Sequence, residues 1–177
     1  IELLSMEHKK AFQSIKLLLG DYSDSERLSD YYFWYGVMLY ELDKNSRAAM
    51  MAMRQVNKQS KRDDDRLYLV GKINHDNKKW GPSILAFVNL KKRHPTSEFL
   101  EEGLFLQARA YFELKKYNSG IEKLDQLLNT FMPLRKPVRE IQLRVRILVA
   151  MQRYEQADKV LKDKISKYSD FSLIKQR

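Results

Sequence analysis

Apolar and small residues recur along this chain of 177 residues at spacings of 34, 37 and 37 positions. One series of this pattern consists of large apolar residues, Phe33, Leu67, Leu104 and Ile141. Three parallel series keep the same spacing: Val37, Gly71, Ala108, Val145; Ala49, Ser83, Gly120, Ala157; and Met53, Phe87, Leu124, Leu161. A fixed period of this size is typical of arrays in which each unit buries its apolar face against its neighbours. We therefore expect a repeat array rather than a domain around a single core.

Each unit has the apolar spacing of helices. In the segment 121–131 the apolar residues fall at i, i+3, i+6, i+7 and i+10, and short polar breaks separate it from its neighbours. Only six Gly and four Pro occur, too few for the turns of a β-sandwich or a Rossmann-type fold. The pattern predicts an all-α fold of helix–turn–helix units. Gly120 and Ala157 would be small so that paired helices can approach closely.

One unit has a recognisable spacing of small and aromatic residues. It reads Leu104-(x3)-Ala108-(x2)-Tyr111-(x5)-Tyr117-(x2)-Gly120-(x3)-Leu124-(x2)-Leu127. This spacing resembles the tetratricopeptide repeat, an antiparallel helix pair. Asn74 and Leu148 depart from the family by replacing the aromatic residue of the first helix. The resemblance implies a right-handed α-solenoid.

The repeat spacing also predicts how the chain is divided. We expect one solenoid over 1–177 that belongs to a longer protein. A partial repeat would occupy 1–28 and the start of a further helix 170–177. Four repeats would lie between them, at 29–62, 63–97, 98–134 and 135–169. Incomplete repeats at both ends would leave apolar faces uncovered. Such faces favour end-to-end self-association.

The segment 94–102, with His94-Pro95 and Phe99, resembles the long turns of bacterial envelope proteins of this repeat class. Outer-membrane assembly lipoproteins and the periplasmic partner of the Tol–Pal system are examples. The resemblance implies a role in a bacterial envelope or motility assembly, with the periplasm favoured and the cytoplasm left open.

The sequence offers no recognisable catalytic or metal-binding motif. It has no Cys, and its three His residues, His8, His75 and His94, lie far apart. No Gly-rich nucleotide-binding motif occurs, and the acidic run Asp63–Asp65 is interpreted as a solvated cap at a helix start. We therefore expect no enzymatic activity, no cofactor and no metal. No apolar run is long enough to predict membrane insertion.

A second repeated series predicts a binding surface. It contains large, mostly aromatic residues, and in three of the four units a basic residue follows four positions later on the same helix face. The residues are Trp34, Tyr68 with Lys72, Phe105 with Arg109, and Gln142 with Arg146. In the family this face of the first helices lines a concave groove that holds a peptide. An acidic protein segment with bulky apolar side chains would suit such a groove. Chance matches in a chain rich in Lys and Arg are the alternative interpretation.

Other functions remain open at this stage. The family's clamp for terminal carboxylates is disfavoured, because its Asn positions hold Tyr35, Leu69, Leu106 and Leu143. Nucleic-acid binding is the main alternative, because residues 135–167 carry 10 basic and 4 acidic side chains, although the polar code of helical RNA readers is missing. An architectural or oligomerisation segment of a larger repeat protein is the second alternative.

Overall fold

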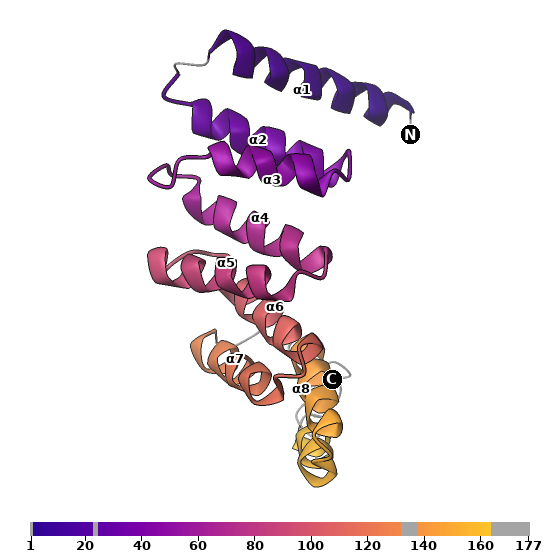
Figure 1. Cartoon of the computed structure of the whole chain (residues 1–177). Helices are drawn as coiled ribbons and strands as arrows, with labels where there is room; N and C mark the ends of the chain where they lie inside the picture. Colours follow the sequence, from indigo (N-terminus) through magenta and orange to yellow (C-terminus); the bar gives the residue numbers. More distant parts are fainter. Residues whose placement is uncertain (1, 23–24, 132–137, 164–177) are drawn as a thin grey trace, which may run out of the picture. The chain divides into compact units, whose positions relative to one another are not determined.

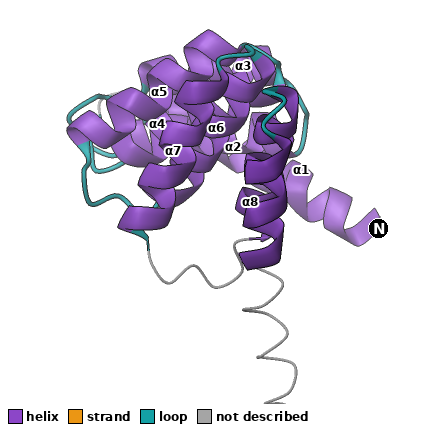
Figure 2. Cartoon of the chain, turned by 90° about the horizontal axis from the view of Figure 1, so that it is seen from below, coloured by secondary structure: helices purple, strands orange, loops and turns teal. Residues whose placement is uncertain are grey.

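The computed structural model describes residues 2–22, 25–131 and 138–163, and every regular element within them is a helix (Figure 2). The all-α prediction is therefore confirmed for the described part of the chain. The chain forms two compact units, residues 1–103 and 104–177, and each is described by itself. The further helix predicted over 170–177 lies outside the described residues.

Figure 1 labels the helices in chain order. The first unit contains α1 (Glu2–Asp21), α2 (Leu28–Glu41), α3 (Ser46–Gln55), α4 (Asp63–Asp76), α5 (Trp80–Arg93) and the start of α6 (Leu100–Glu113). The second unit contains the rest of α6, α7 (Tyr117–Thr130), α8 (Val138–Ala150) and a helical segment at 154–163. Helix α2 packs against α3, and α4 packs against α5, which is the pairing that the repeat predicts.

The turns inside the pairs repeat at the predicted interval. Each contains one residue with a positive φ, and these residues follow the 34, 37, 37 spacing: Lys44, Lys78, Lys115 and Gln152. In the last three turns a backbone N–H bonds to a carbonyl five residues earlier, as Lys79 does to Asn74 at 2.8 Å. This bond closes a helix that ends in the left-handed conformation. The helix–turn–helix period is thus visible in the backbone.

The first turn differs from the other three by one residue. Here the N–H of Asn45 bonds to the carbonyl of Leu39, six residues earlier. A Cβ on Gly36 would meet Met53, as a Cβ on Gly71 would meet Phe87. Because Met53 and Phe87 occupy equivalent positions in their repeats, the residue of α2 that is equivalent to Gly71 is Gly36. The repeat spacing predicted that Val37 would be equivalent to Gly71, and this prediction was wrong by one residue in α2.

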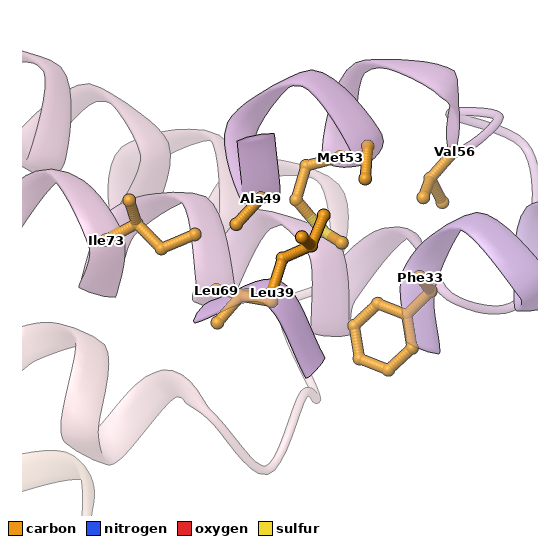
Figure 3. Packing of buried hydrophobic residues seen from close by; sticks show 8 residues of the cluster. Phe33, Leu39, Ala49, Met53, Val56, Leu69 and Ile73 are labelled. Carbon is orange, nitrogen blue, oxygen red and sulfur yellow. The ribbon is translucent and has the colours of Figure 1, made fainter. Parts of the chain in front are cut away.

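Small residues at the pair interfaces let the large side chains fill the remaining space. Ala49 and Ser83 are fully buried, and the Ser83 hydroxyl donates to the Gly71 carbonyl at 2.9 Å. Met53 extends into the apolar cluster of α2, α3 and α4 in Figure 3, where it lies among the buried residues Phe33, Leu39, Ala52, Val56, Leu69 and Ile73. In the second unit, a Cβ on Gly120 would lie 3.3 Å from the Ala108 carbonyl oxygen. The prediction that Gly120 is a close-contact position is confirmed.

The acidic run at the start of α4 is not a solvated cap. The residue at the helix cap is Arg62, without a side-chain capping bond, and Asp63 is fully buried. The Asp63 carboxylate forms close ion-pair contacts with three side chains. It lies 2.6 Å from Arg66 Nη2, 2.8 Å from Arg93 Nη2 and 2.6 Å from His94 Nε2. Asp63 therefore ties the start of α4 to the end of α5. The interpretation as a solvated cap was wrong because only three-dimensional packing brings Arg93 and His94 to this carboxylate.

Candidate functional site

In the first unit, Lys72 is the centre of a small polar network on α4. Its Nζ lies 3.2 Å from Glu41 Oε1 and 5.3 Å from the centre of the Tyr40 ring. The Tyr40 hydroxyl donates a hydrogen bond to the Asp76 carboxylate, and burial together with this carboxylate raises the pKa of Tyr40 above its ordinary value. The positive charge of Lys72 is thus already countered by a carboxylate of its own chain.

The aromatic residues predicted beside Lys72 have other neighbours. Tyr68 is half-buried and stacks on Phe99, with ring centres 4.6 Å apart. Trp34 is 47% exposed, and the Arg62 guanidinium lies 5.4 Å from its ring centre. The one-residue shift in α2 makes Phe33, rather than Trp34, the counterpart of Tyr68. The structure therefore does not give Trp34 and Tyr68 equivalent positions.

In the second unit, Phe105 belongs to the packed interior. It is 9% exposed, and the Arg139 guanidinium lies 4.2 Å from its ring centre. Unlike Phe105, the basic residues predicted to lie beside it, Arg109 and Arg146, are exposed to solvent. Gln142 is exposed as well. Arg146 lies 4.9 Å from the centre of the Phe112 ring. The exposed cations of α6 and α8, rather than the aromatic side chain of Phe105, are available to a partner.

The sequence analysis missed a groove between the second helices α3 and α5. Two hollows of about 450 and 780 Å³ lie there and share Asn74 and Pro82 in their walls. Six basic residues and no acidic residue line them: Arg47, Arg54, Lys58, Arg66, Lys79 and Arg93. The spacing of Arg47 and Arg54, seven positions apart on one short helix, was a signal that could have drawn attention to this surface.

The described residues contain no group of three or more His, Cys, Asp or Glu that could hold a metal ion. None of the described helices is long and apolar enough to cross a membrane.

Comparison with known families gives one match, to the tetratricopeptide repeat over residues 102–131. The matched segment covers most of α6 and all of α7. The chain contains a tetratricopeptide repeat. No curated protein matches the chain. The match confirms the resemblance predicted from Leu104 to Leu127, and the successive helix pairs are those of a tetratricopeptide-like helical solenoid. Tetratricopeptide repeats generally mediate protein–protein interaction and are typically non-enzymatic scaffolds.

Proposed function

We propose that this chain is a non-enzymatic interaction module whose first helices bind an acidic protein segment carrying apolar side chains in their concave groove. The observation that carries the proposal is the pair Arg109 and Arg146. They lie 37 residues apart, at the same repeat position on α6 and α8, and both are exposed. Neither has an ion-pair partner among the described residues.

The chemistry of these residues favours carboxylates. A guanidinium group donates two parallel hydrogen bonds to a carboxylate, and an exposed cation that has no carboxylate partner loses no ion pair when it binds one. Lys72, in the first unit, is less available to a partner, because a partner carboxylate would compete with its ion pair to Glu41. The apolar side chains of the partner would supply contact area, while the charges would orient it.

The aromatic residues argue against the nucleic-acid alternative. Proteins that bind single strands stack bases on exposed aromatic rings. Here the Phe105 ring is buried beside Arg139, and Tyr68 is already stacked on Phe99. Trp34 is 47% exposed, but the Arg62 guanidinium lies 5.4 Å from its ring centre. These three positions therefore offer no series of open rings for stacking bases, and a peptide is the favoured ligand. The role in a bacterial envelope or motility assembly, which follows from the turn at 94–102, stays part of this proposal.

Neutralising both arginines tests the proposal. The probe is a fluorescein-labelled synthetic peptide in which Glu and Asp alternate with Leu, titrated at low salt by fluorescence anisotropy. Arg109→Gln with Arg146→Gln should weaken binding at this site by about tenfold, because two exposed charged contacts of about 0.7 kcal/mol each add to about 1.4 kcal/mol, a factor of ten. The helical circular-dichroism signal should not change.

The matched control is Lys116→Gln with Lys159→Gln, which removes the same charge from exposed positions of the same unit. It should bind within about twofold of the unmodified chain. If both double variants weaken binding equally, the effect comes from net charge alone, and the assignment to Arg109 and Arg146 is wrong.

A further inference from the structure

The groove between α3 and α5 is built from the face of α4 that is opposite to Tyr68 and Lys72. Both α3 and α5 pack on α4, and they do not pack on each other. The floor of the groove includes Val70 and Asn74. Because successive helix residues are rotated by about 100°, Lys72 lies about 160° around α4 from Val70. The groove is therefore a surface separate from the one proposed above.

The walls of the groove combine apolar and basic side chains. Met51 of α3 is 59% exposed and Leu85 of α5 is 60% exposed, so large apolar groups remain open to solvent on both sides. Exposed apolar side chains gathered around a hollow are typical of a binding surface.

The positive charge of the groove is only partly countered by carboxylates. Arg47, Arg54 and Lys79 have no ion-pair partner among the described residues. Arg66 and Arg93 share the single carboxylate of Asp63, which is itself buried. Cations that line an apolar hollow without acidic neighbours produce a positive potential that attracts anionic groups.

We propose that this groove binds a short acidic protein segment whose apolar side chains enter the two hollows. The carboxylates would pair with Arg47, Arg54 and Lys79, and the apolar side chains would contact Met51 and Leu85. The floor from Arg66 to Asn77 is about 16 Å long, which accommodates about five extended residues. The Asn89 amide, which also lines the groove, offers a donor and an acceptor to a peptide backbone.

The lining distinguishes a peptide from a nucleic acid. No Phe, Tyr or Trp lines either hollow, so bases would find no ring on which to stack. The flexible thioethers of Met50 and Met51 instead suit apolar side chains of varied shape. Charge and apolar contact together favour the acidic segment.

The first test is peptide binding by the full chain. The probe is the fluorescein-labelled peptide of alternating acidic residues and Leu. In a chain that already carries Arg109→Gln and Arg146→Gln, so that the first site does not bind the same probe, the triple variant Arg47→Gln, Arg54→Gln, Lys79→Gln should weaken its binding by at least about tenfold at low salt. The matched control, Lys10→Gln, Lys116→Gln, Lys159→Gln, removes the same charge from exposed positions outside the groove and should change binding by less than about threefold. Equal losses in the two triple variants would overturn the proposal.

The second test locates the bound peptide. With ¹³C-methyl methionine, the resonances of Met50 and Met51 should shift on peptide addition, while that of Met151 in the second unit should stay in place. Met51→Glu should abolish the shift of Met50, because it places a negative charge, which repels the acidic peptide, in the groove at a position that tolerates a polar residue. This readout also separates the groove from the first helices, where Arg109→Gln with Arg146→Gln should leave the Met51 shift intact.

Three outcomes would contradict the proposal. The Met50 and Met51 resonances could stay in place while the peptide binds. A peptide of Glu alone could bind as tightly as the peptide containing Leu, which would show that the apolar walls contribute nothing. A single-stranded oligonucleotide could bind with higher affinity and shift the same resonances, which would assign the groove to nucleic acid.

Discussion

Replacing Asp63 with asparagine should lower the free energy of unfolding by about 3 kcal/mol, because it removes one partner of a buried ion pair. Asp63 is fully buried and holds Arg66, whose side chain is 12% exposed, together with Arg93 and His94. The amide would leave the buried Arg66 charge without a counterion. Urea unfolding of the full chain, followed by circular dichroism, measures the change.

The neighbouring carboxylate supplies the control. Asp64 accepts one hydrogen bond from the Ser97 hydroxyl at 3.1 Å and is only partly buried. Asp64→Asn keeps a hydrogen-bond acceptor at this site and should cost less than about 1 kcal/mol. If Asp63→Asn is as mild as Asp64→Asn, the ion cluster does not hold α4 and α5 together.

Replacing Gly71 with alanine should lower the free energy of unfolding by about 2 kcal/mol, despite the better helix propensity of alanine. A Cβ at this position would lie 2.6 Å from the Phe87 ring, which is 1% exposed and cannot move aside. Gly20→Ala provides the contrast, since a Cβ there meets nothing within 4 Å. It should leave stability unchanged or raise it slightly.

A double-mutant cycle checks the cause of the Gly71 effect. Phe87→Leu alone should be destabilising, because it removes packed ring atoms. Combined with Gly71→Ala, it should cost less than the sum of the two single changes, because the smaller side chain relieves the clash. Strict additivity would show that the Gly71 effect does not come from contact with Phe87.

The sequence predicted the repeat period well because the period is written in residues that must be small or apolar. Gly71, Ala108 and Gly120 can be found by spacing alone, since close helix contact excludes larger side chains at these positions. The extra residue in the first turn could not be found this way. Gly36 and Val37 are both compatible with a helix interface, and only the contact of Gly36 with Met53 in the folded chain shows which one faces α3.

The candidate site was less predictable, because charge and exposure depend on neighbours from other helices. Spacing alone does not show that Glu41 pairs with Lys72, or that Arg139 covers the Phe105 ring. The basic groove escaped detection for the same reason. Its cations come from α3, from the loop after α3, from α4, from the turn after α4 and from α5, so no single segment carries the pattern.

The central claim is that this chain, which contains a tetratricopeptide repeat at residues 102–131, recognises acidic protein segments that carry apolar side chains. Selection of a random peptide display library on the immobilised full chain, followed by sequencing, tests it most directly. We predict enrichment of peptides with more Asp and Glu than Lys and Arg, together with Leu, Ile, Met or Phe. Enrichment of basic peptides, or no enrichment over the unselected library while the chain binds single-stranded RNA, would contradict the claim.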